Sequence, residues 1–575
     1  MKLSKIKFSS FIAAISAMLV LVFFASSAFA ADFTWTGAKS NVLDDKDNWS
    51  DRVVPGSADK GTITVSGDEP VTFTLQTDTF APKTLNVKPD TGSTAPVIFD
   101  FAKHTMTQSG DYLNVTVRSF TITNGVWTGD GLKGKTSWGA GNETDTYEFN
   151  IVDAEYNPHW GDWAWVNKAY AGGTLRVRNS KSNYVPIFQR NLTLICDNSC
   201  VRGMVPSNPA AGTNFFWHVT NHSIVTNSIF SGKYCCSHVV VDGDSAIDYD
   251  DGLNIGASNS VAHDNILAVS NSMIHVNDIT VAGTNDTAYF HNVDFISRAT
   301  WRELRLYGVS NKVYFSGTQP MYNARKTYPG LGTHFEIGEG CVLTNGEMKL
   351  SAAKDVTLKV CKDARFRCST LETKNGDTVL SGSKFLVEKG AQVSLDQFNG
   401  NFGLNGSSNV ISIRGSVKVD KIAELGMYGP VSGCRLELIG DEAEFISGVN
   451  VGGSSGYLKL GSTDCPNALT LKFQPGSTGF GGVAPLRPFD TYVLRACTLN
   501  DAIIEVDARE YCAALPARKE AYRLPLIFGG YSLTVADFDV LKAKAVLKPA
   551  GELVLEGKTL YYEFYKKPGL MILVR

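Results

Sequence analysis

The residues with the clearest potential for chemistry in this chain are carboxylates gathered in one short stretch. The sequence there reads Asp-Gly-Asp-Ser-Ala-Ile-Asp-Tyr-Asp-Asp over residues 242–251. Calcium is bound by carboxylate and carbonyl oxygens, so Asp244, Asp248, Asp250 and Asp251 are candidate ligands of a calcium ion. The order does not fit an EF-hand loop, and aspartate-rich runs between strands are often solvated turns. Calcium is the only cofactor that the sequence indicates, and a plain turn is the alternative.

A second group of candidates is aromatic and lies in a glycine-containing insertion at residues 127–165. Flat indole rings that carry a polar N–H suit the stacking of sugars. The insertion therefore predicts a carbohydrate-binding surface, whose candidate residues are Trp127, Trp138, Trp160, Trp163 and Trp165. The alternative is that these rings fill a satellite core beneath a long loop.

Cysteine usage is compatible with an exported protein, because the chain holds 11 Cys and disulfides form in oxidising compartments. Cys196 and Cys200 flank a short Asp-Asn-Ser segment and are the candidate disulfide. We expect most other cysteines to act as small buried apolar side chains.

A repeat organises the part of the chain that must position these residues. Short apolar segments begin at Leu358, Phe385, Ile411, Leu436 and Leu458, and their starts are 22 to 27 residues apart. A fixed period of this size is typical of a solenoid, in which each repeat buries its apolar face against its neighbours. We therefore expect Ile413, Leu438 and Leu460 to point inward at equivalent sites of successive coils.

The interior of one repeat indicates which solenoid this is. Segments such as 411–413 and 416–419 alternate apolar and polar residues and are separated by turn residues, without a helical apolar stripe. This pattern predicts an all-β fold, a right-handed parallel β-helix with three strands per coil. A β-sandwich also has short, evenly spaced strands, but it gives no reason for the period to persist.

The sequence divides into five regions. Residues 1–30 combine three lysines, an apolar run and Ala-Phe-Ala, which predicts a secretory signal peptide. The predicted regions that follow are an N-terminal cap at 31–70, irregular coils at 71–240, regular coils at 241–483 and a β-rich C-terminal cap at 484–575. The net charge of −3 argues against a nucleic-acid partner, and we expect no membrane span after signal cleavage.

Short motifs carry a resemblance to a known group of proteins. Phe33-Thr-Trp-Thr-Gly, then Asn48-Trp-Ser, and the Gly- and Asn-rich stretch 252–260 resemble exported β-helix proteins of the bacterial autotransporter-passenger type. The resemblance implies an extracellular, cell-surface or periplasmic location in a bacterium. Region 484–575 departs from that type because it lacks the alternating strands of a translocator barrel.

A narrower resemblance concerns the aspartate pair. Asp250-Asp251 before Leu-Asn-Ile is similar to the paired aspartates of polygalacturonase-type β-helix hydrolases. This resemblance implies that Asp250 and Asp251 are the acid and base of an inverting hydrolysis. The Gly-His-Gly and Arg-x-Lys motifs of those enzymes do not follow in this chain.

Three functional hypotheses follow from these observations. The first is a secreted or cell-surface structural or adhesin-like β-helix protein without evident catalytic activity. The second is a carbohydrate-binding protein that uses the tryptophan-rich insertion. The third is a polysaccharide hydrolase or lyase that acts near Asp250 and Asp251. The expected partner in each case is an extracellular polysaccharide or another cell-surface component.

Overall fold

The computed structural model describes the following residues: 30–108, 110, 112–129, 135–138, 146–157, 172–183, 192–202, 214–226, 231–232, 236–248, 252–255, 263–296, 303–323, 325–349, 354–372, 382–399, 408–419, 433–447, 459–461, 469–488, 497–500, 502–528, 533–534 and 538–567. The fold is a right-handed parallel β-helix, as predicted. The chain divides into two compact units, residues 1–189 and 190–575, which are described separately. No described helix is long and apolar enough to cross a membrane.

Unit 1 consists of two groups of parallel strands and two short 3-10 turns, η1 (Lys46–Asn48) and η2 (Ser50–Arg52), which lie between the first two strands. One sheet contains β1 (Asp32–Thr34), β2 (Lys60–Val65), β4 (Thr84–Pro89), β7 (Tyr112–Val115) and β9 (Lys135–Trp138). The other group contains β3 (Val71–Thr74), β5 (Val97–Asp100), β6 (Thr105–Gln108), β8 (Ser119–Gly129), β10 (Thr146–Asn157), β11 (Gly172–Arg178) and β12 (Lys181–Asn183). Strands β8 and β10 run around a corner, since β6 pairs with the second half of β8 and β12 with the second half of β10.

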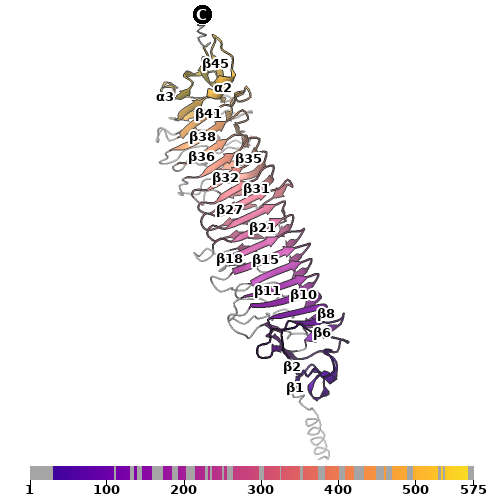
Figure 1. The fold of residues 1–575 in the computed structure, drawn as a ribbon. Helices are drawn as coiled ribbons and strands as arrows, with labels where there is room; N and C mark the ends of the chain where they lie inside the picture. Colours follow the sequence, from indigo (N-terminus) through magenta and orange to yellow (C-terminus); the bar gives the residue numbers. More distant parts are fainter. Residues whose placement is uncertain are drawn as a thin grey trace, which may run out of the picture. The chain divides into compact units, whose positions relative to one another are not determined.

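The main sheet of unit 2 is called here the first column, and its strands follow one another in chain order (Figure 1). Its members are β13 (Leu192–Asp197), β15 (Asn214–Thr220), β18 (Cys236–Val241), β21 (Ile266–Ser270), β24 (Thr287–His291), β27 (Lys312–Ser316), β30 (His334–Ile337), β32 (Thr357–Val360), β34 (Lys384–Val387), β36 (Val410–Ile413), β38 (Cys434–Ile439), β41 (Leu469–Gln474), β44 (Ile503–Asp507) and β47 (Val546–Lys548). All neighbours in it pair in parallel, which requires one complete turn of chain between successive strands.

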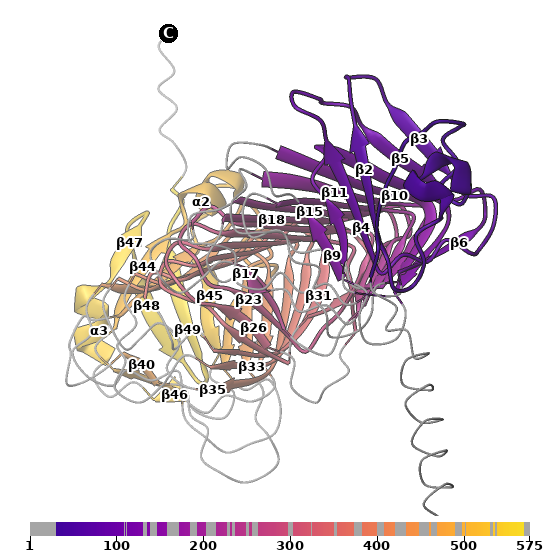
Figure 2. The same ribbon diagram turned by 90° about the horizontal axis from the view of Figure 1, so that it is seen from below.

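A short second column and a long third column complete the coils of unit 2. The second column contains β14 (Cys200–Arg202), β16 (Ile224–Thr226), β19 (Ala246–Asp248), β22 (Met273–His275) and β25 (Asp294–Ile296). The third column contains β17 (Ser231–Gly232), β20 (Leu253–Ile255), β23 (Asp278–Val281), β26 (Glu303–Leu306), β29 (Lys326–Tyr328), β31 (Val342–Lys349), β33 (Arg365–Glu372), β35 (Gln392–Asn399), β37 (Ser416–Val419), β39 (Glu444–Ser447) and β42 (Leu486–Pro488), with β28 (Met321–Tyr322) beside β31. In Figure 2 the third-column strands β23, β26 and β33 lie on a different side of the coil from β15 and β18.

The C-terminal part of unit 2 departs from the coil pattern. Strand β45 (Tyr522–Phe528) pairs antiparallel with β49 (Thr559–Phe564), and β49 pairs antiparallel with β48 (Gly551–Glu556). Strands β40 (Lys459–Gly461), β43 (Cys497–Asn500) and β46 (Leu533–Thr534) form a small parallel sheet, and two helices are present, α2 (Arg509–Ala514) and α3 (Phe538–Lys544). The assignment of 31–70 and 484–575 as caps stays a prediction.

The core of unit 2 is a stack of apolar side chains at equivalent sites of the first column. Because alternate residues of a strand face opposite sides, one residue per strand continues the stack. Its members are fully or almost fully buried and are register partners in the order Val269, Phe290, Phe315, Ile337, Val360, Val387, Ile413, Leu438, Phe473 and Val506. Such a core grows with the number of coils rather than with the width of a domain.

The prediction that Leu460 belongs to the core stack is wrong. Ile413 and Leu438 are register partners, as expected. The partner of Leu438 in the next coil is Phe473, whereas Leu460 belongs to the small sheet and pairs with Leu499. The coil after Leu438 is longer than its predecessors, so the expected spacing selected a different apolar segment.

Buried serines form a hydrogen-bonded ladder where the chain turns from the first to the second column. The serine ladder consists of Ser199, Ser223, Ser245 and Ser272. The backbone N–H of each of the first three donates to the hydroxyl of the next, over 3.1, 3.1 and 3.2 Å. Hydroxyls of the ladder in turn donate to backbone carbonyls, as Ser223 does to Thr220 over 2.6 Å. The ladder satisfies backbone groups that burial would otherwise leave unpaired.

Asparagines occupy the outer side of the same corner. Asn198, Asn221, Asn271 and Asn292 have backbone φ angles between 46° and 53°. Asparagine tolerates this left-handed region better than most residues with a side chain. The backbone conformation of this turn therefore accounts for part of the high asparagine content of the sequence.

A second buried polar ladder precedes the first-column strands and contains a carboxylate. Both the backbone N–H and the side-chain amide of Asn265 donate to Asp286 Oδ1, over 2.9 and 2.8 Å. The Gly283 N–H donates to Asp286 Oδ2 over 2.7 Å, and the Asp286 N–H donates to Asn311 Oδ1 over 3.0 Å. Burial outweighs these hydrogen bonds and raises the pKa of Asp286 above its ordinary value.

Candidate functional site

The outer face of the first column carries an aromatic pair in which one ring is exposed and the other half-buried. Tyr289 on β24 and Tyr314 on β27 are register partners whose rings stack at 5.1 Å between centroids with an interplanar angle of 12°. Tyr289 is 46% exposed. Its register partner in the preceding coil is Ala268, so no aromatic ring stacks on Tyr289 from that coil. The pair is therefore a flat apolar surface that a ligand ring can reach.

Polar groups surround this pair on the same face. The imidazole of His334 lies 5.8 Å from the Tyr314 ring, between centroids, and its Nε2 is 3.1 Å from Glu336 Oε2. His291, two residues after Tyr289, contacts the Ser316 hydroxyl through Nδ1 over 3.0 Å. Hydroxyl and imidazole groups beside an aromatic ring offer hydrogen bonds to a polyhydroxylated ligand.

Charges on this face are compensated from coil to coil. The ammonium of Lys359 lies 3.5 Å from Glu336 and 3.2 Å from Glu388. Burial opposes ionisation of Glu336, but the hydrogen bond to His334 and the charge of Lys359 outweigh it and lower the pKa of Glu336. Burial, followed by the proximity of Tyr289, raises the pKa of Tyr314, so this phenol stays protonated at neutral pH.

Of the five tryptophans predicted to bind carbohydrate, the structure describes the side chain of Trp127 alone. Trp127 is fully buried on β8, and its ring stacks on the buried ring of Tyr156 at 4.7 Å between centroids. Its assignment as a sugar-stacking residue is wrong, because neither face of the ring is open to a ligand. Trp138 ends β9, whose side chains are not among those described, and Trp160, Trp163 and Trp165 lie outside the described residues.

Two of the four predicted calcium ligands are described, and they take different partners. Asp248 on β19 lies with one carboxylate oxygen 2.9 Å from His275 Nδ1, and both side chains are largely shielded from solvent. Asp244 is exposed in the preceding turn, where its carboxylate is 4.0 Å from His222. Within the described part of the chain, no cluster of three or more metal-ligating side chains exists. Asp250 and Asp251 lie outside the described residues.

The predicted disulfide is not present in the structure. Cys196 and Cys200 are both free thiols, the first buried and the second exposed. Cys196 lies on β13 with its side chain buried in the core, whereas Cys200 is the first residue of β14 and its side chain is exposed. The turn between them therefore directs the two side chains apart. Burial raises the pKa of the Cys196 thiol to about 12.

The aromatic pair is the feature that inspection of residue types alone missed. Tyr289 and Tyr314 each precede a phenylalanine of the core stack, Phe290 and Phe315. Because neighbouring residues of a strand face opposite sides, an inward phenylalanine requires the tyrosine before it to face outward. The signal was present in the sequence as two aligned Tyr-Phe pairs in consecutive repeats.

The fold and its outer face define the chain as a parallel β-helix protein with an exposed aromatic and polar surface. Comparison with known proteins found no family model, no curated protein and no solved structure that matches it.

Proposed function

We propose that the protein is an exported, adhesin-like β-helix that binds extracellular glycans without transforming them. The observation that carries this proposal is the exposed ring of Tyr289, which is stacked on one side by Tyr314 and has only Ala268 as its partner on the other. The apolar face of a sugar ring packs on such a surface through dispersion and removal of apolar area from water.

The surroundings of Tyr289 support a glycan rather than a purely apolar ligand. His291, Ser316 and His334 place hydrogen-bonding groups at the edge of the aromatic pair. The stacked rings lie on paired β-strands, so little conformational entropy is lost when a ligand binds. Export and surface presentation rest on the predicted signal peptide and on the resemblance to autotransporter-type passengers.

The experiment is a glycan array probed with the mature protein, followed by titration of the best ligand. Tyr289→Ala should weaken binding about tenfold, because loss of a stacking surface costs on the order of 1 kcal/mol or more. The matched control is Tyr322→Ala, which removes another exposed tyrosine, 59% accessible on β28. Retention of full affinity in Tyr289→Ala, or an equal loss in the control, would refute the assignment of this site. Failure of the parent to bind any glycan would refute the function.

A second candidate function is polysaccharide cleavage on the second column, favoured by the Asp248–His275 pair. A carboxylate 2.9 Å from Nδ1 orients the imidazole ring, and an oriented imidazole can transfer a proton as a general acid or base. The test is release of reducing or unsaturated ends from acidic and neutral polysaccharides. Activity lost in both Asp248→Asn and His275→Gln, with melting temperature unchanged, would establish this function. The absence of released ends with every substrate would exclude it for those substrates.

A further inference from the structure

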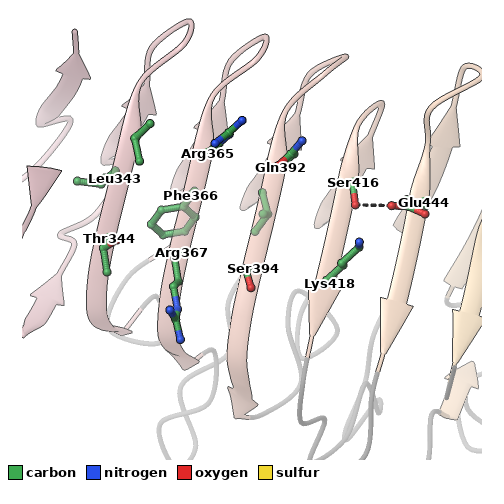
Figure 3. A pocket seen from close by; sticks show the side chains of 12 residues that line it. Leu343, Thr344, Arg365, Phe366, Arg367, Gln392, Ser394, Ser416, Lys418 and Glu444 are labelled. Carbon is green, nitrogen blue, oxygen red and sulfur yellow. Dashed lines mark hydrogen bonds between the residues drawn. The ribbon is translucent and has the colours of Figure 1, made fainter. Parts of the chain in front are cut away.

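A hollow of about 460 Å³ lies on the outer face of the third column, away from the aromatic pair (Figure 3). It crosses the strands β31, β33, β35, β37 and β39. The outward side chains form two rows in register, one through Arg365, Gln392 and Ser416 and the other through Arg367, Ser394 and Lys418. These side chains are cationic or hydrogen-bonding, so the hollow suits an elongated polar ligand that runs from coil to coil.

Part of the charge in this hollow is already compensated. Arg367 lies 3.3 Å from Asp396. Glu444 accepts a hydrogen bond from the Ser416 hydroxyl (Figure 3). Glu444 also forms an ion pair with Arg487. Asp396 is paired with Arg367 and Glu444 with Arg487, and neither carboxylate forms an ion pair with the two remaining cations.

Arg365 and Lys418 are the cations that remain. Both are exposed, and neither forms an ion pair with any residue that the structure describes. Arg365 lies on β33 and Lys418 on β37, with β35 between them. Strands in a sheet are about 4.8 Å apart, which places the two strands about 10 Å from one another. Between them, Gln392 and Ser394 can donate and accept hydrogen bonds.

A lysine on the outer face of the first column differs from these two cations. There, Lys359 is held between Glu336 and Glu388 of the neighbouring coils, so its charge is compensated within the protein. Arg365 and Lys418 have no such partner among the described residues, so their charges can attract an external anion. Arg365 and Lys418 are two coils apart, and this separation favours a chain with repeated acidic groups over a single small anion.

We infer that this hollow is a binding site for a linear acidic polysaccharide, whose carboxylate or sulfate groups pair with Arg365 and Lys418. Gln392 and Ser394 contact sugar hydroxyls between the two charges. The guanidinium of Arg365 binds an oxyanion through two parallel N–H groups, while the ammonium of Lys418 acts as a point charge. The site goes beyond the function proposed above, because it lies on another face of unit 2 and uses none of the same residues.

The experiment measures binding of the mature protein to polygalacturonate and dextran sulfate, with neutral dextran and a single-stranded DNA oligomer as comparison probes. The double variant Arg365→Gln/Lys418→Gln should lose at least about tenfold in affinity for the acidic polysaccharides. Binding should also weaken with salt in the parent and depend less on salt in the variant. Preference for polygalacturonate or dextran sulfate would identify the acid as a uronate or a sulfate.

The matched control is Lys354→Gln/Lys384→Gln, which removes the same charge from two exposed positions, one before β32 and one at the start of β34. This control should change affinity less than about twofold, because it leaves the hollow intact. Equal losses in the two double variants would show that only net charge matters and would overturn the site. Unchanged binding in the hollow variant, or tighter binding of DNA than of polysaccharide, would also overturn it. Tyr289→Ala should leave this binding unchanged, so failure of the two proposals can be told apart.

Discussion

Replacing Ser223 by alanine removes one hydroxyl from the middle of the serine ladder. The carbonyl of Thr220 keeps a donor, because the Asn198 N–H also donates to it over 3.2 Å. The buried N–H of Ser199 loses its acceptor. Removing an acceptor from a buried donor costs about 1–3 kcal/mol, so we expect a local destabilisation of about 2 kcal/mol.

Hydrogen exchange measured by mass spectrometry is the suitable assay, because a solenoid of many coils does not unfold as one two-state unit. A loss of about 2 kcal/mol speeds local exchange about thirtyfold, since each 1.4 kcal/mol corresponds to tenfold. The effect should appear in β14 and β16 and be absent from β36 and β38. Ser412→Ala is the matched control, because Ser412 lies on the outer face of β36. Exchange in β14 and β16 that matches the parent would refute the role assigned to the ladder.

Three further predictions follow from the core and the thiols. Leu438→Ala and Phe473→Ala should each lower the free energy of unfolding by about 2–5 kcal/mol. Because the two residues are register partners, a double-mutant cycle should show a coupling energy of about 0.5–3 kcal/mol. Strictly additive effects would contradict this register. Iodoacetamide at pH 8 followed by peptide mapping should alkylate Cys200 in the native protein and spare Cys196, whose pKa burial raises to about 12; protection of both would indicate a bridge. Burial raises the pKa of Asp286 above its ordinary value of 3.8, so folding favours the protonated carboxyl. The stabilising contribution of Asp286 is therefore full below pH 3.8 and is lost as pH rises through the higher pKa of the folded state. The melting temperature of the parent relative to Asp286→Asn should fall over that pH interval. A difference in melting temperature that stays constant with pH would contradict the raised pKa.

The fold was predictable because two independent periodicities agree. Alternation within each short segment indicates strands, and the recurrence of segments indicates coils. Ile413 and Leu438 could be aligned from the sequence alone because the coil between them has the common length. The next step failed because Phe473 follows Leu438 by 35 residues, beyond the range that the repeat suggested. Strand pairing holds the register, while the connections between strands are free to vary in length.

The sites were less predictable because the chain bends within strands. On β8 the inward positions are Phe120 and Ile122 before the corner and Trp127 after it. The corner at Asn124, with φ of 54°, shifts which residues face inward by one position. Simple alternation from Ile122 would therefore direct Trp127 outward. Tyr289 and Tyr314 lie on uninterrupted strands, so alternation alone is sufficient to place them on the surface.

The serine ladder also bears on how such a chain can change length during evolution. Each rung after Ser199 receives a hydrogen bond from the coil before it, so a duplicated segment keeps the ladder intact only if it comprises one whole coil. The ladder ends after Ser272, where Val293 takes the equivalent buried position beside the register pair Met273 and Asp294. Duplications before this point must carry a serine, whereas coils inserted after it need only an apolar side chain there. Related chains should therefore differ in length by complete turns, with the serine or valine at this corner recording where each turn was added.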